Sequence, residues 1–297
     1  MCIRYYSPMK ILKSLPIKIH IWGGLGSQLH GVALALDLQN RFPKRNVVLY
    51  LHTGGISRRD SELQGLFPEV EKIVVDDFKL PTKTKAHGRA KNPRISLSQL
   101  VKKSLLLSGL LATSNDADEY ISIKPWVYEI RGHYSYRPIS RNSADIIIKR
   151  ITDLANSDER NTRTLAIHLR LGDLLNLESK SFVDIEKLGQ ELIRILQNHR
   201  FETARVYSDS PELALSYLEP YLDGLKIQVS ERSALDLLSD SLHFDYFVGT
   251  NSKISFWAVF FRFNKLFTCE QSIPAETRQN LLSLEGPEIR LPDCQFY

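Results

Sequence analysis

Residues 17–31 read IKIHIWGGLGSQLHG, and this stretch decides the fold of the first part of the chain. The run Ile17–Trp22 predicts a β-strand, and apolar residues at helical spacing predict a helix over 28–41. Three glycines separate the two elements, where a tight turn or the close approach of a ligand requires a small residue. Free N–H groups at a helix start also attract anions, so a plain turn and an anion site both remain open.

Strand-like and helix-like segments alternate along the rest of the chain, which predicts an α/β fold with parallel sheets. We expect two Rossmann-like domains facing a cleft, divided at the polar stretch 156–164 into an N-terminal domain (1–155) and a C-terminal domain (156–297). A packing of the last helix back onto the first domain stays open. Further strands are expected at 47–51, 73–75, 165–170, 204–207, 225–229 and 246–249, and helices at 105–111, 142–156, 184–199, 211 onward, 233 onward and 255–263.

Composition and charge narrow the class of protein. The chain has 297 residues, of which 43% are hydrophobic, so it can bury a full core. A net charge of +5 suits a polyanionic ligand, an acidic membrane surface or nucleic acid. The basic residues are dispersed, with a local excess at 83–103, and no Arg-rich stripe stands out, so we expect no nucleic-acid partner.

Cysteine usage and hydropathy indicate the compartment. Three widely spaced cysteines do not form a disulfide framework or a metal-ligand spacing, which favours a reducing environment. The first residues lack the apolar segment of a signal peptide. The longest apolar run, 254–261, is far shorter than the about 20 residues that span a bilayer. We expect a cytoplasmic protein, either free or peripheral at the inner face of the cell membrane.

The segment HLRLGD, residues 168–173, ends the strand expected at 165–170. Side chains alternate along a strand, so His168 and Arg170 project to the same side at its carboxyl end. The planar guanidinium of Arg170 could grip a phosphate with two hydrogen bonds. Gly172 allows a sharp turn that Asp173 can cap or orient. The alternative is an Arg–Asp ion pair that supports the loop.

The segment GTNSK, residues 249–253, joins a buried strand to a helix. Hydroxyl and N–H groups at a helix start can cradle a phosphate, and Lys253 adds positive charge. The alternative is ordinary N-capping by Asn251 or Ser252.

These segments together resemble a known family. GGLGSQL (23–29), HLRLGD (168–173), YSDSPE (207–212) and the segment from Asp236 to NSKISFW (251–257) resemble, in this order, motifs of bacterial α-1,2-fucosyltransferases. RGHYSY (131–136) lies where that family has a further motif. The HLRLGD segment is also similar to a motif of the α-1,6- and protein O-fucosyltransferases in the same superfamily.

The resemblance implies a GT-B fold, an inverting mechanism and a nucleotide-diphosphate sugar donor, with no cofactor and no metal. It implies that Arg170 binds the β-phosphate and stabilises the leaving diphosphate, and that His168 contacts the donor. The other donor-binding positions that it implies are Gly24, Gly26, Asp173, Asp209, Asp236, Asn251, Ser252 and Ser255.

An inverting sugar transfer without a metal needs a group that stabilises the leaving diphosphate and a base that activates the acceptor. Without a metal, a fixed Arg and helix-end N–H groups must stabilise the charge on the leaving diphosphate. Inversion needs a base that deprotonates the acceptor hydroxyl, and its identity stays open. The candidates on the acceptor side are Ser27, His30 and His133, with Asp37 and Glu129 weaker. The adjacent pair 76–77 follows a strand in the first half and gives no metal motif.

Departures from the family pattern leave the donor open. Ser27 replaces the family's Asn, Leu171 replaces its second Arg, and Phe256 replaces the first residue of its tryptophan pair. We expect fucose transfer from GDP-fucose to an oligosaccharide or lipid-linked glycan acceptor of the O-antigen or capsule type. The alternatives are another activated sugar on the same scaffold, or a non-catalytic protein that binds nucleotide sugars or glycans. A nicotinamide oxidoreductase is excluded because GGLGSQ departs from G-x-G-x-x-G.

Overall fold

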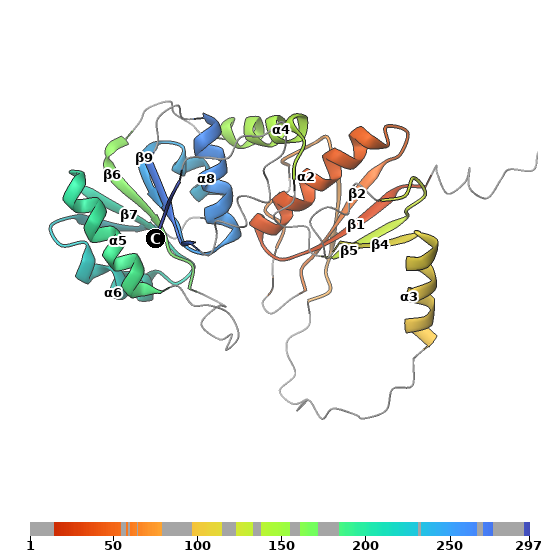
Figure 1. Ribbon diagram of the computed structural model, residues 1–297, viewed down its shortest axis with the longest axis horizontal. Coiled ribbons are helices and arrows are strands. Elements are labelled where there is room, and N and C mark those ends of the chain that lie inside the picture. Colours follow the sequence, from red (N-terminus) through yellow and green to blue (C-terminus); the bar gives the residue numbers. More distant parts are fainter. Residues whose placement is uncertain are drawn as a thin grey trace, which may run out of the picture. The chain divides into compact units, whose positions relative to one another are not determined.

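The computed structural model describes residues 15–54, 58, 60–63, 65–78, 97–114, 123–132, 138–154, 161–171, 184–230, 233–265, 270–275 and 294–297. The chain divides into two compact units, Met1–Arg137 and Pro138–Tyr297 (Figure 1). Each unit has its own all-parallel sheet, which confirms the predicted α/β class of the GT-B type with two Rossmann-like parts. That the two parts face a cleft stays a prediction.

The first unit has a five-stranded sheet in the order β3-β2-β1-β5-β4. Figure 1 shows helix α2 lying over one face of this sheet, along β1 and β2. The elements are β1 (Ile17–Trp22), α2 (Leu25–Arg41), β2 (Val47–His52), β3 (Glu71–Val75), α3 (Leu97–Ser108), β4 (Leu111–Ser114) and β5 (Glu129–Gly132).

Glycines set the fit between β1 and α2. Gly23 has φ +107°, a conformation that side-chain-bearing residues rarely adopt, so the turn can be tight enough to start α2 at Leu25. The helix therefore begins three residues before the expected 28–41, and Gly26 and Ser27 lie in its first turn. A Cβ on Gly31 would lie 1.6 Å from Ile21 Cδ1, so this glycine allows the helix to pack closely on the strand.

The second unit has a six-stranded sheet in the order β11-β10-β9-β6-β7-β8. Its elements are α4 (Arg141–Thr152), β6 (Asn161–His168), α5 (Ile185–Asn198), β7 (Thr203–Tyr207), α6 (Pro211–Leu218), the 3-10 turn η3 (Glu219–Tyr221), β8 (Lys226–Ser230), α7 (Ala234–Ser241), β9 (Phe244–Val248), α8 (Lys253–Lys265), β10 (Glu270–Ile273) and β11 (Gln295–Phe296).

Alternation along β6 separates two layers of helices. Leu165 and Ile167 pack into an apolar core with residues of α5 and α6, including Leu188 and Leu192. His168 points to the other face, where it contacts α8. Figure 1 accordingly shows α8 on the opposite side of the sheet from α5 and α6. Helices α4, α7 and α8 pack on one another in this second layer.

The division between the units lies earlier than the polar stretch 156–164 suggested. Helix α4 has a buried stripe that includes Ala144, Ile147 and Ile151, and it packs on α7 and α8 rather than within the first unit. The compact units therefore divide after Arg137. A return of the last helix to the first part stays a prediction.

Several expected bounds are corrected by the structure. Strand β6 ends at His168, so Arg170 lies beyond it rather than inside it. The apolar run 105–111 is not one helix, because α3 ends at Ser108 and Gly109 takes φ +74° before β4 begins. Ser210 stands at the start of α6, but its side chain makes no capping hydrogen bond. Within the described residues, no helix is long and apolar enough to cross a membrane.

Candidate functional site

The strand order of the second unit reverses beside β6. Strands β7 and β8 follow on one side of β6, and β9 and β10 lie on the other. In open parallel sheets, ligands bind beyond the carboxyl ends of the strands at such a reversal. His168 is the last residue of β6, and Gly249 directly follows β9. The start of α8 comes four residues after Gly249, so the expected phosphate segments meet at this point.

A buried polar cluster fills the reversal point. His168 Nδ1 lies 2.7 Å from Ser255 Oγ and 3.4 Å from Ser252 Oγ, and the two hydroxyl oxygens are 3.2 Å apart. The backbone N–H of Thr250 donates to Ser255 Oγ over 3.0 Å. All four residues are buried. These hydrogen bonds among buried groups hold the cluster in one arrangement.

The start of α8 is fixed by a side-chain cap and by a glycine. Ser255 N–H donates to Ser252 Oγ over 3.0 Å, so Ser252 caps the helix, as the alternative interpretation of this segment expected. A Cβ on Gly249 would lie 2.7 Å from Ser255 Cβ and 2.8 Å from its Oγ. The glycine therefore allows the helix start to press against the strand end. Tyr297 donates its hydroxyl hydrogen to the Gly249 carbonyl over 2.8 Å.

Burial controls the charge of His168. Desolvation lowers the pKa of this imidazole to about 4; the nearby Asp209 carboxylate opposes the shift and Arg170 adds to it. The ring is therefore neutral at pH 7, so it organises the two serine hydroxyls without adding charge. Positive charge at this edge of the sheet comes from Arg170 instead.

Arg170 stands directly beside the cluster. Its backbone N–H donates to Thr250 Oγ1 over 3.3 Å, and its side chain is half-buried. The next residue, Leu171, is buried in the apolar core, and its N–H donates to Asp209 Oδ1 over 2.9 Å. The exposed Asp209 thus fixes the backbone that follows β6, and this anchoring holds Arg170 at the carboxyl edge of the sheet.

The remaining donor-side candidates lie in different surroundings. Asp236 closes a capping box with Ser233 at the exposed start of α7, as the S-x-x-D spacing predicted. Asn251 is half-buried in the loop before α8. Asp173 lies outside the described residues. The structure thus brings together His168, Arg170, Asp209, Ser252 and Ser255, while their proposed contacts with a donor stay predictions.

The first unit contains two of the donor-binding candidates, Gly24 and Gly26, and the acceptor-side candidates. Gly24 is the extended residue that precedes α2, and Gly26 is buried in the first turn of that helix. Ser27 is half-buried in the same turn. His30 is only 2% exposed, which argues against direct contact between its imidazole and an acceptor. His133 lies outside the described residues.

One group of the first unit was missed by the sequence interpretation. The imidazole rings of His20 and His52 are hydrogen-bonded to each other, and each ring also contacts a carboxylate. The signal was present, because Lys18, His20 and Trp22 alternate with buried isoleucines along β1. Asp77 was considered only as part of a metal motif, and its contact with His52 depends on the pairing of β2 with β3.

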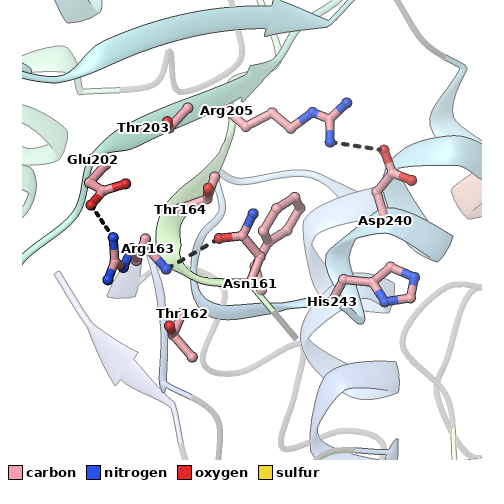
Figure 2. Close-up of a pocket in the computed structure, with 10 residues that line it drawn as sticks. Asn161, Thr162, Arg163, Thr164, Glu202, Thr203, Arg205, Asp240 and His243 are labelled. Atoms are coloured by element: carbon pink, nitrogen blue, oxygen red, sulfur yellow. Dashed lines mark hydrogen bonds and ion pairs between the residues drawn. The ribbon is translucent and has the colours of Figure 1, made fainter. Parts of the chain in front are cut away.

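A polar pocket of about 580 Å³ lies at the amino ends of strands in the second sheet. Figure 2 shows two ion pairs along its lining, Arg163 with Glu202 and Arg205 with Asp240. Its lining comes from the amino ends of β6, β7 and β9, whereas His168 lies at the carboxyl end of β6. Ligands of parallel sheets bind at the carboxyl ends of the strands, so this pocket is not the expected ligand site.

Comparison with known proteins gives only distant similarities. No protein-family model and no curated protein sequence matches the chain. The E. coli heptosyltransferase WaaC with ADP has a TM-score of 0.45 at 11% identity, with 95% of this chain and 92% of that chain covered. A glycosyl transferase of family 9 from Veillonella parvula has a TM-score of 0.42 at 10% identity, covering 87% and 80%. POFUT1 in complex with GDP has a TM-score of 0.43 at 14% identity, covering 88% and 98%. At these values the activity of this chain must be argued from its own residues.

Proposed function

We propose that the protein is an inverting glycosyltransferase that transfers fucose from GDP-fucose to a hydroxyl of a surface glycan. The observation that supports this most is the convergence of His168, Ser252 and Ser255 at the strand-order reversal, with Arg170 beside them. The order of the motifs along the chain supports a nucleotide-diphosphate sugar as the donor.

The arrangement suits cleavage of a glycosyl–diphosphate bond. As this bond breaks, negative charge develops on the leaving diphosphate. The guanidinium of Arg170 can bind two of its oxygens, and N–H groups at the start of α8 add partial positive charge. Thr250 fixes the backbone of Arg170, and the His168 cluster fixes the start of α8, so the two sources of positive charge are positioned before the reaction. The acceptor oxygen attacks the opposite face of the sugar and inverts the anomeric centre.

A second candidate is a different activated sugar on the same scaffold. The observation that favours it is Leu171, which stands where the resembling family has a second Arg. Its side chain is buried in the apolar core, so this position supplies no positive charge to a diphosphate. Such a site would depend more heavily on Arg170.

The acceptor and the location follow as parts of the same proposal. An oligosaccharide or lipid-linked glycan is the expected acceptor, and no nucleic acid is involved. The net charge of +5 suits peripheral contact with an anionic membrane from the cytoplasmic side.

Nucleotide binding and turnover test the proposal. We expect GDP to raise the melting temperature more than UDP, ADP or dTDP, and a clear preference for another nucleotide would select the second candidate. Arg170→Ala should lower donor turnover about 100-fold or more, because one preorganised donor to a developing charge contributes that much. Arg170→Lys is the matched control, since it keeps the charge and loses the planar fork. Turnover of Arg170→Ala within a few-fold of wild type would refute this role.

A further inference from the structure

The first unit has its own strand-order reversal, and aromatic rings gather there. Strands β2 and β3 lie on one side of β1, and β5 and β4 on the other. On the face of the sheet opposite the buried isoleucines of β1, Trp22 stacks on His52 with ring centroids 4.2 Å apart. His20 stacks on Tyr50 at 5.1 Å. Trp22 ends β1 and is 41% exposed, so part of its ring is available at the carboxyl end of the sheet.

The two imidazoles link two carboxylates in a continuous chain. Asp77 Oδ2 lies 2.7 Å from His52 Nδ1, His52 Nε2 lies 2.8 Å from His20 Nδ1, and His20 Nε2 lies 3.0 Å from Glu129 Oε1. Outside the chain, Asp77 Oδ1 accepts the N–H of Gly54 over 2.8 Å. Arg131 donates to Glu129 at the other end.

Counting hydrogens shows that this chain can take up one proton. Each of the three contacts along the chain needs one hydrogen to form a hydrogen bond. Each neutral imidazole carries one N–H hydrogen, so the two rings together supply only two. In one tautomeric arrangement both N–H groups point toward Glu129, and the contact between Asp77 and His52 lacks its hydrogen. One added proton fills that contact.

The surroundings of His20 and Asp77 disfavour protonation of these two groups before an acceptor binds. Burial lowers the pKa of His20; Glu129 raises it, and Arg131, His52 and Lys18 lower it further. The contact with His52 lowers the pKa of Asp77, so that carboxylate is ionised near neutral pH. A carboxylate alone is a weak base, but the His52 imidazole behind it offers a ring nitrogen that can take the proton.

We propose that the chain Asp77–His52–His20–Glu129 is the proton acceptor for a sugar hydroxyl, and that the exposed face of Trp22 binds the ring of that acceptor sugar. This inference rests on the proposed function and names the acceptor half of it. Asp77 contacts the hydroxyl, because its side chain is 37% exposed against 21% for Glu129. His52 and His20 are positioning residues that act through Asp77.

The proton and electron movements balance. The acceptor hydroxyl gives its proton to the Asp77 carboxylate, which passes it to Nδ1 of His52. The electron pair of the acceptor oxygen forms the bond to the anomeric carbon, while the bond from that carbon to the diphosphate breaks and its electron pair leaves with the diphosphate. The chain later returns the proton to solvent.

The geometry favours a proton site over a metal site. The two imidazole nitrogens face each other at 2.8 Å instead of converging on a common point. Among the residues that the structure describes, no group of three or more His, Cys, Asp or Glu side chains is placed to hold a metal ion.

Two variants separate the two parts of the inference. His52→Phe keeps a ring against Trp22 and removes both nitrogens, so acceptor transfer should fall about 100-fold or more in kcat, the range for general-base catalysis. The limb of the kcat–pH profile that reports the base should also disappear. Trp22→Leu should raise KM for the acceptor about tenfold, with a smaller change in kcat, because it removes the stacking surface and leaves the chain intact. His243→Phe, in the second unit, is the control.

The assay uses GDP-fucose with methyl α- and β-D-galactopyranoside and methyl α-D-mannopyranoside as probe acceptors, and it records GDP binding and donor hydrolysis in every variant. GDP binding should stay unchanged in His52→Phe and Trp22→Leu. Sugar binding is also followed by quenching of Trp22 fluorescence with Trp22→Leu as the blank, and proton uptake by the imidazole 15N signals.

The failures are distinguishable. Wild-type protein that neither binds GDP nor hydrolyses the donor would refute the proposed function. In that case, quenching of Trp22 fluorescence by the glycosides, together with 15N signals showing that His20 and His52 take up a single proton between them, would still support this inference. Persistent donor hydrolysis with kcat of His52→Phe and KM of Trp22→Leu within a few-fold of wild type overturns this inference alone. Independent titration of His20 and His52, or no quenching by any probe, also overturns it.

Discussion

A methyl group added at Gly249 should damage both the stability of the second unit and its polar cluster. The Cβ of Gly249→Ala would lie 2.7 Å from Ser255 Cβ and 2.8 Å from Ser255 Oγ, well inside normal van der Waals contact. The start of α8 must therefore move away from the end of β9. Overpacking of this kind costs about 1–3 kcal/mol.

The shift also breaks hydrogen bonds at the cluster. Ser255 Oγ accepts from Thr250 N–H and contacts His168, and a buried polar group that loses its partner costs about 1–3 kcal/mol. We therefore expect Gly249→Ala to lower the free energy of unfolding by roughly 2–6 kcal/mol. Urea denaturation at pH 7 measures this change, and GDP titration measures the loss of binding.

A double-mutant cycle isolates the clash. Ser255→Gly removes the atoms that the new Cβ would strike, so Gly249→Ala should cost at least about 1 kcal/mol less in that background than in the wild type. Binding of GDP should not recover, because the hydroxyl at position 255 is missing. Effects that add within about 0.5 kcal/mol would show that the two residues do not interact and would refute the reasoning.

Three further predictions concern the second unit. Burial lowers the pKa of His168 to about 4 from an ordinary value of 6.5, so between these values the unfolded chain binds a proton that the folded chain does not. The free energy of unfolding should therefore be highest above pH 6.5 and fall by up to about 3 kcal/mol toward pH 4. Urea denaturation measures this fall, which should be smaller in His168→Asn. Asp236→Ala and Ser233→Ala should each cost about 1 kcal/mol by removing the capping box, and a loss of GDP affinity confined to Asp236→Ala would reveal a separate nucleoside contact. Arg262→Leu should lower the free energy of unfolding by about 3 kcal/mol or more, since the buried guanidinium donates to backbone carbonyls of α7, β9 and β10, and a change under 1 kcal/mol in thermal or urea unfolding would contradict this.

The sequence predicted the repeated β–α pattern well where periodicity was strong. The bounds of β1 were predicted as the structure has them, because three isoleucines alternate with Lys18, His20 and Trp22 over its length. Strand β5 was missed because Glu129–Gly132 contains one buried apolar residue and two charged ones, so its strand character comes from pairing with β1 and β4. Such pairing joins residues that are far apart in the sequence.

The site was predicted in its members more than in its geometry. The resemblance gave His168 and Ser255 separately as donor-side positions, and the structure shows that they contact each other directly. Spacing alone could not show that the hydroxyls of Ser252 and Ser255 turn inward to the imidazole, because that depends on how deeply α8 packs. Leu171 was interpreted only as a lost positive charge, whereas it is part of the apolar core.

The inward orientation of the His168 cluster limits how this protein can acquire a new specificity. A substitution at His168, Ser252 or Ser255 would leave a hole or an unsatisfied polar atom in the interior, so selection for a different donor would first have to repair the fold. Asn251 lies at the same end of the strands with more exposure and can change at lower cost. Directed evolution of this scaffold should therefore begin at that position and leave the buried cluster as it is.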